Sequence, residues 1–139
     1  VAHKNINLIS HNQRHSAEAS GVSEAEWRER VAKIPTLDYR AERERRLAFG
    51  VSKAEEDHAE AVLAELLDEM EAALSKRPWL AGDEYSLADI SITPYVQRFA
   101  ANGLARLVDW SARPAVGDWW KRVTARPSYA EGMRLDLAG

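Results

Sequence analysis

The sequence LAGDEYSLADI occupies residues 80–90 and predicts the start of the helix on which the fold depends. Ser86 and Asp89 have the Ser-x-x-Asp spacing of a capping box. In such a box the hydroxyl accepts from the backbone N–H of the third helical residue, and the carboxylate accepts from the N–H of the serine. Tyr85 and Ile90 flank the box at the positions of a hydrophobic staple. We therefore predict a helix that begins after Ser86, with Ser86 and Asp89 in a structural role.

Apolar side chains follow the box on every side of this predicted helix, which is typical of a helix that is buried all round. They are Leu87, Ile90, Ile92, Pro94, Tyr95, Val96, Phe99 and Ala100. Pro94 removes one helical hydrogen bond and crowds the carbonyl four residues earlier, so we expect a bend there. This segment is the expected central helix of the domain.

Capping boxes and stop signals divide the chain upstream of residue 80 into further helical segments. We expect helices at about residues 1–16, 23–34, 38–49 and 52–76. The second and fourth of these begin with Ser-x-x-Glu boxes, and Gly50 suits the end of the third. The fourth carries the longest amphipathic stripe in the sequence, so we expect it to pack against the central helix.

After the central helix the sequence predicts a stop, a short helical turn and a last helix. The Asn-Gly pair at 102–103 is the stop signal. Pro114 suits the first position of the last helix, and Pro127 is expected to end it. Asp118 and Arg122 have the i, i+4 spacing of an ion pair. No segment alternates like a β-strand, so the predicted fold is an all-α bundle of about six helices in a single domain, residues 1–139.

The composition excludes several classes of function. The 139 residues carry a net charge of −3, which gives no electrostatic reason to expect nucleic acid or an anionic membrane as a partner. The absence of cysteine excludes disulfides, thiolate metal sites and a cysteine nucleophile. No apolar run is long enough for a transmembrane helix and no signal peptide is recognisable, so we expect a cytoplasmic location.

Two groups of side chains could bind an ion. The first is Arg40, Arg43, Arg45 and Arg46, which could hold a carboxylate or a phosphate, although the interleaved glutamates favour an ordinary solvated helix face. The second is His11 and His15, which have the spacing of a two-histidine metal pair. No third ligand accompanies the two histidines, so we expect no metal site.

Motifs between about Leu80 and Met133 resemble the second half of a cytosolic glutathione transferase. They are GDEYSLADI at 82–90, RPAV at 113–116, a tryptophan at 119 or 120, Arg122, and RPSY at 126–129. The resemblance implies the all-helical C-terminal domain of that family, in which the Ser86/Asp89 box serves folding. It also implies that the first helix lines the pocket for the electrophilic substrate and contributes to the dimer contact. On that basis the pocket residues are expected to be His11, Asn12, Tyr95 and Arg98, with the alternative that His11 and Asn12 are ordinary polar groups on the surface of the first helix.

The same resemblance sets what function to expect. Glutathione transferases activate glutathione on a thioredoxin-like domain that precedes the helical one, and nothing in this chain could build it. We therefore expect no catalytic residue and no cofactor in this chain, with glutathione as co-substrate of a parent protein. The expected parent reaction is glutathione conjugation or glutathione-dependent dehalogenation, as in the dehalogenase-like bacterial branch. Expected partners are the parent's thioredoxin-like domain and a second copy of the chain. The alternative is a non-enzymatic docking module with the same helical fold.

Overall fold

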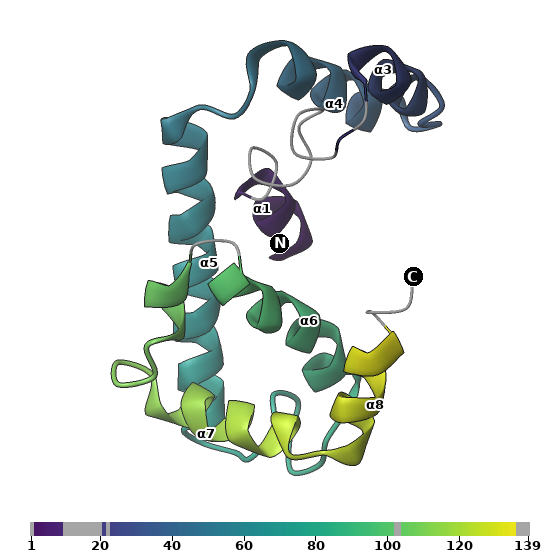
Figure 1. Cartoon of the computed structure of the whole chain (residues 1–139). Coiled ribbons are helices and arrows are strands. Elements are labelled where there is room, and N and C mark those ends of the chain that lie inside the picture. The colour runs from purple at the N-terminus through teal and green to yellow at the C-terminus, as the bar shows by residue number, and fades with distance from the viewer. Residues whose placement is uncertain (1, 10–20, 22, 102–103, 136–139) are drawn as a thin grey trace. The chain divides into compact units, whose positions relative to one another are not determined.

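The computed structural model describes residues 2–9, 21, 23–101 and 104–135. The described part of the chain is helical and contains no strand, apart from one isolated bridge between Trp79 and Gly82. The all-α prediction is confirmed. The helices are α1 (Ala2–Ile9), α3 (Glu24–Ala32), α4 (Leu37–Phe49), α5 (Lys53–Leu74), α6 (Leu87–Ala101), the 3-10 helix η2 (Ala105–Val108), α7 (Pro114–Thr124) and α8 (Pro127–Leu135) (Figure 1).

The contacts of the chain fall into two compact units, which are described separately. One consists mainly of His3–Val62 and the other of Leu63–Gly139, so the division lies inside α5. Whether the chain is one folding domain, as its length suggests, stays a prediction. None of the described helices is both long enough and apolar enough to cross a membrane.

In the first unit α3 and α4 pack on each other as a helical pair. The Ser23 hydroxyl accepts from the backbone N–H of Glu26 at 3.3 Å, so α3 begins where its sequence predicts. The Glu26 carboxylate pairs with Arg30 instead of returning to Ser23, which leaves this box half formed. At the end of α4, Gly50 has a φ of 69° and donates to the carbonyl of Arg46, as expected for a helix stop.

In the second unit the carboxylate of Asp89 joins three segments of the chain. It is fully buried, and its Oδ2 accepts from the backbone N–H of Ser86 at 3.0 Å and from the Ser86 hydroxyl at 3.1 Å. Its Oδ1 accepts from the N–H of Leu80 at 3.1 Å and from Trp119 Nε1 at 2.8 Å. The serine hydroxyl differs from the expected pattern, because it accepts from the N–H of Ala88 and not from that of Asp89. The start of α6 is therefore fixed to the preceding loop and to α7 at once.

The expectation that α6 is buried on all sides is wrong. Val96 and Phe99 are at most 2% exposed, but Leu87 is 77% and Ile90 is 49% exposed. Leu87 and Ile90 lie three residues apart and so share a helix face, which is largely exposed. The helix continues through Pro94 to Ala101. The bend at Pro94 stays a prediction.

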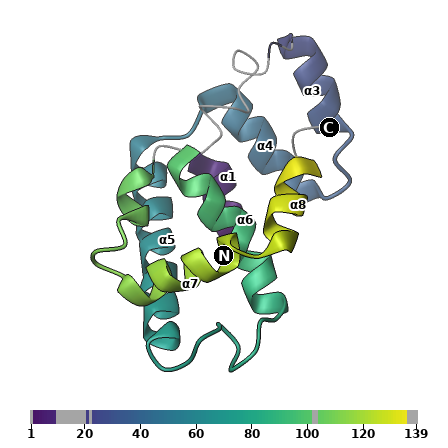
Figure 2. The same ribbon diagram turned by 60° about the horizontal axis from the view of Figure 1, so that its bottom comes forward.

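The first turn of α7 is capped from another helix. The residue before it, Arg113, supplies no side-chain cap, and Pro114 occupies the first turn. Glu71 of α5 accepts from the backbone N–H groups of Ala115 at 3.1 Å and Val116 at 2.9 Å. A carboxylate at this position satisfies two amides that a helix leaves unpaired and also suits the positive end of its dipole. The contact ties α7 to α5, and the ribbons of these two helices lie beside each other in Figure 2.

Two expectations for the last part of the chain need correction. Asp118 pairs with Lys121 at 3.0 Å, and Arg122 instead donates to the carbonyl of Pro78 at 2.6 Å. Its guanidinium lies 5.3 Å from the centre of the Trp79 ring, so Arg122 anchors the loop before α6. Pro127 also does more than end α7, because it begins α8, a helix that the sequence pattern did not predict. The predicted stop at 102–103 lies outside the described residues.

Candidate functional site

A pocket of about 460 Å³ lies between α1 and α5, within the first unit. We call it the first-helix pocket. It is lined by Lys4, Asn5 and Leu8 of α1 and by Glu55, His58 and Val62 of α5. The three α5 residues are spaced i, i+3 and i+7, which places their side chains on one helix face. The pocket therefore combines two aliphatic side chains with a rim of polar and ionisable groups.

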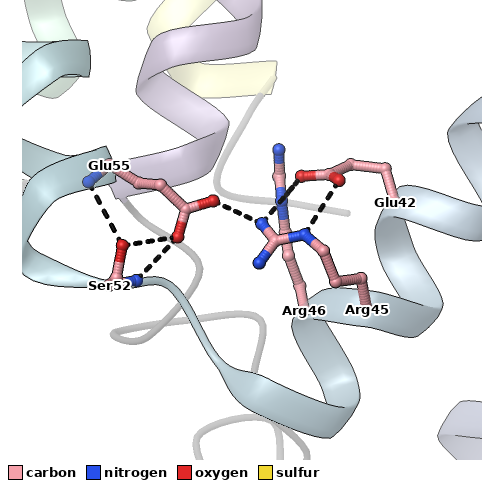
Figure 3. A network of polar contacts seen from close by, with 5 residues as sticks. All are labelled: Glu42, Arg45, Arg46, Ser52 and Glu55. Atoms are coloured by element: carbon pink, nitrogen blue, oxygen red, sulfur yellow. Dashed lines mark hydrogen bonds and ion pairs between the residues drawn. The ribbon is translucent and has the colours of Figure 1, made fainter.

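Glu55 is held firmly in the wall of this pocket. Its Oε2 accepts from the Ser52 N–H at 2.9 Å and from the Ser52 hydroxyl at 2.8 Å, while its own N–H donates to that hydroxyl at 3.3 Å. Its Oε1 accepts from Arg45 at 2.5 Å (Figure 3). These hydrogen bonds, first those from Ser52, lower the pKa of Glu55. The carboxylate thus stays ionised at neutral pH and serves as a fixed acceptor and not as a proton donor.

The two basic residues at the pocket have no such constraint. Lys4 and His58 are both exposed, and neither forms an ion pair within the described part of the chain. The Glu55 charge beside them is already balanced by Arg45. An electron-rich or anionic group of a bound molecule could therefore approach Lys4 and His58 while its apolar part contacts Leu8 and Val62. Sequence reasoning assigned His58 no role, although its spacing from Glu55 and Val62 places it on their face.

The arginine cluster of α4 is used for contacts inside the protein. Arg40 donates to the carbonyl of Ile34 at 2.8 Å, and the Arg43 guanidinium lies 5.5 Å from the centre of the Trp27 ring. The other two arginines of the cluster bind acidic residues, at distances from 2.5 to 3.1 Å. These contacts favour the interpretation in which the cluster is part of the fold and is not an anion site.

Glu42 is the centre of this ion-pair network. It accepts from Arg45 at 3.1 Å and from Arg46 at 2.8 Å, and Arg46 is only 5% exposed (Figure 3). The hydrogen bond from Arg45, opposed by burial and reinforced by Arg46, lowers the pKa of Glu42 from 4.5 to about 2. Protonation of Glu42 would leave the buried Arg46 without its charged partner.

We expect this network to make the first unit sensitive to acid. Because the pKa of Glu42 is lowered in the folded state, its contribution is present above pH 4.5 and is lost as the pH falls towards about 2. The side chain is 37% exposed, so solvent screening limits the contribution to about 1 kcal/mol. Thermal unfolding between pH 5 and pH 2 measures this loss. The Glu42→Gln variant should be less stable than the original chain at neutral pH, and its stability should fall less between pH 5 and pH 2. An equal fall in both proteins would contradict the assignment of the acid sensitivity to Glu42.

Comparison with known proteins identifies the family. The family model described as "Glutathione S-transferase, C-terminal domain" matches residues 26–127, which is most of the chain. The chain belongs to this family. The match runs from within α3 to the end of α7 and includes the capping box at Ser86 and Asp89. The family that the motifs resembled in the sequence is therefore confirmed.

Two curated relatives of this glutathione transferase domain illustrate the match. Glutathione S-transferase GstB of Escherichia coli (strain K12) is 34% identical over 69 residues, which are 50% of this chain and 31% of that protein. Glutathione S-transferase TCHQD of Arabidopsis thaliana is 32% identical over 109 residues, 72% of this chain and 39% of that protein. The chain thus spans about a third of the length of these curated relatives.

A solved structure supports the helical fold of the glutathione transferase domain. The crystal structure of Beta-etherase LigF from Sphingobium sp. strain SYK-6 matches 94% of this chain and 55% of that chain, with a TM-score of 0.76. The sequence identity is 24%, so this likeness shows the fold alone.

The predicted pocket residues of the glutathione transferase domain divide into two groups. His11 and Asn12 lie outside the described residues, as does His15 of the predicted histidine pair. Tyr95 and Arg98 are half-buried on α6 and do not line the first-helix pocket. Their role in substrate binding stays a prediction. Within the described residues no group of three or more potential ligands could hold a metal ion.

Proposed function

We propose that this chain is the substrate-side domain of a glutathione transferase-like protein and that the first-helix pocket holds the electrophile. The observation that carries the proposal is the position of this pocket on α1, the helix that the resemblance of the sequence to glutathione transferases assigns to the substrate side. Leu8 and Val62 give it an apolar part, as small-molecule sites generally have. The polar rim supplies a small number of orienting groups.

The proposed parent reaction is attack of the glutathione thiolate on this electrophile. The sulfur forms a bond to the electrophilic carbon, and the leaving group departs with the bonding electron pair. In conjugation of a halogenated compound, as in dehalogenation, the leaving group is a halide. Lys4 and His58 lie at the pocket and could stabilise the negative charge that develops on it. Glutathione and its thiolate would be held by the parent's thioredoxin-like domain, and the length of the curated relatives leaves room for such a domain.

The test has two steps. The 139-residue chain alone is expected to add nothing to the uncatalysed conjugation of glutathione with 1-chloro-2,4-dinitrobenzene, because the thiol-activating domain is missing. In a longer protein that joins it to a thioredoxin-like domain, Val62→Thr should raise the KM for the electrophile about tenfold. The substitution keeps the shape of the side chain and introduces a hydroxyl into the apolar part of the pocket. The KM for glutathione should not change.

Leu37→Ala is the matched control, since Leu37 is 71% exposed on α4 and does not line the pocket. It should leave both KM values as they are. Low-micromolar binding of glutathione to the isolated chain, measured by calorimetry, would contradict the proposal that the thioredoxin-like domain holds glutathione. An increase in the glutathione KM with Val62→Thr would contradict the assignment of the pocket.

We further propose that α1 and the first part of α5 contribute to a homodimer contact. The family resemblance supports this proposal, because it assigns the first helix to both the pocket and the subunit contact. Sedimentation of the chain over a concentration series measures the association. A strict monomer at about 100 μM would count against the dimer and would favour the docking-module alternative, in which a different protein covers these helices.

A further inference from the structure

A second cavity, of about 220 Å³, lies between α6 and α8 in the second unit. We call it the α6–α8 cavity. Its walls include the rings of Tyr85, Tyr129 and Pro94, together with Ile90 and Thr93. Among the residues that the structure describes, no charged side chain lines it. It shares no lining residue with the first-helix pocket, so its chemistry can be considered by itself.

On the α8 side of this cavity, the space around Gly132 is open. A β-carbon added to Gly132 would meet no atom within 4 Å. Gly132 lines the cavity, and it lies three residues after Tyr129 on the same helix face. The β-carbon of a larger side chain at this position would therefore displace no neighbour, and the rest of the side chain could occupy the open volume.

The aromatic walls are held in place by contacts outside the cavity. The Tyr85 ring meets Trp79 edge-on at 5.1 Å between centroids, and the Arg126 guanidinium lies 3.8 Å from its centre. The Tyr129 hydroxyl donates to Gln97 Oε1 at 2.5 Å, and its ring meets Trp120 edge-on at 5.8 Å. A wall that is already fixed loses little conformational entropy when a molecule binds against it.

The polar groups of the wall differ in what they can still bind. The Thr93 hydroxyl donates to the carbonyl of Asp89 at 2.6 Å, and the hydrogen of the Tyr129 hydroxyl is used on Gln97. The hydroxyl of Tyr85 has no hydrogen-bond partner within the described residues, although its ring is fixed. Ser128 also lines the cavity, and its hydroxyl likewise has no hydrogen-bond partner within the described residues. An incoming molecule therefore finds a largely apolar surface with two available hydroxyls, of which only that of Tyr85 is phenolic and held on a fixed ring, and each can both donate and accept.

We propose that the α6–α8 cavity binds a neutral single-ring phenol, with its ring between Tyr85 and the Ile90/Pro94 side and its hydroxyl on the hydroxyl of Tyr85. The volume sets the size of the ligand, because an apolar cavity of about 150 Å³ already accepts benzene. At about 220 Å³ there is room for one ring with small substituents. The uncharged lining favours a neutral molecule over an ionised one. Its described lining residues all differ from those of the proposed electrophile pocket.

The experiment is a titration of the 139-residue chain with 4-fluorophenol and with fluorobenzene, followed by fluorine NMR of the probes. The two probes differ only in the hydroxyl. We expect saturable binding of both, with 4-fluorophenol bound more tightly. Tyr85→Phe should weaken 4-fluorophenol about fivefold and change fluorobenzene less than twofold, because it removes one hydrogen bond and keeps the ring. An equal effect on both probes would overturn the role of the Tyr85 hydroxyl.

Gly132→Leu is the filling variant and should weaken both probes at least about tenfold, while circular dichroism shows the helix content retained. Ala130→Leu is its control, since Ala130 is exposed on the same helix and does not line the cavity. It should bind both probes like the original chain. If Gly132→Leu unfolds the chain, the effect of Tyr85→Phe on the two probes alone decides whether they bind in this cavity. The absence of saturable binding below about 10 mM, or equal weakening by Ala130→Leu, would overturn the proposal.

Discussion

Replacing Asp89 by alanine is expected to lower the free energy of unfolding by about 3–5 kcal/mol, a large effect for a single substitution. The carboxylate is fully buried and accepts four hydrogen bonds, from Ser86 N–H and hydroxyl, Leu80 N–H and Trp119 Nε1. The helix cap alone would account for about 1 kcal/mol. The additional loss follows because the donors of Leu80 and Trp119 would remain buried without a partner.

Chemical denaturation measures this loss of stability, and two further variants serve as comparisons. Asp89→Asn keeps the size of the side chain but turns an amide NH₂ towards groups that are themselves donors, so an intermediate loss is expected. Asp118→Ala removes an exposed carboxylate whose only partner within the described residues is Lys121, and it should change the stability by less than about 0.5 kcal/mol. A loss at Asp89 as small as that at Asp118 would mean that the four bonds do not stabilise the native state.

Gly117→Ala is expected to lower the free energy of unfolding by about 1–3 kcal/mol. Gly117 is buried in α7, and a β-carbon there would lie 2.7 Å from the Cβ of Trp110 and 3.0 Å from its Cγ. Cβ is bonded directly to the backbone, so either the segment around Trp110 or α7 itself would have to shift. This cost exceeds the gain of about 0.5–1 kcal/mol that alanine usually brings to a helix.

The same substitution at Gly132 is expected to have the opposite sign. A β-carbon there meets nothing within 4 Å, so only the helix-propensity gain of about 0.5–1 kcal/mol remains. Thermal unfolding of the two variants side by side tests the pair. Destabilisation by Gly132→Ala would show that the opening on the α8 side is smaller than described, and unchanged stability of Gly117→Ala would show that Trp110 moves freely.

The parts of the fold that were predictable from the sequence are those fixed by residues close together in the chain. The starts of α3, α5 and α6 follow from boxes that span four residues, and the end of α4 follows from Gly50. The contacts that were missed join distant segments. Arg122 binds Pro78, 44 residues away, and Trp119 binds Asp89, 30 residues away. An i, i+4 pattern cannot exclude a more distant partner that is better placed, which is why Arg122 does not pair with Asp118.

The candidate site, too, was predictable only where its residues lie close together in the sequence. The i, i+3, i+7 spacing of Glu55, His58 and Val62 was readable from the sequence and would have indicated a common face. That this face meets Lys4 and Leu8 of α1 follows only from the packing of helices some 50 residues apart in the chain. The exposure of Ile90 could not be predicted either. The sequence does not distinguish an apolar residue that is buried from one that lines an open cavity.

The cap that Glu71 supplies to α7 has a consequence for the order in which the chain is made. Residues are added from the N-terminus at about 5–20 per second, so Glu71 leaves the ribosome roughly 2–9 s before Val116, its partner 45 residues later. Isolated helices of the length of α5 form within microseconds. The acceptor for the first amides of α7 can therefore be in position before those amides exist. A helix of 11 residues that lacks a side-chain cap of its own can begin on a surface that has already folded.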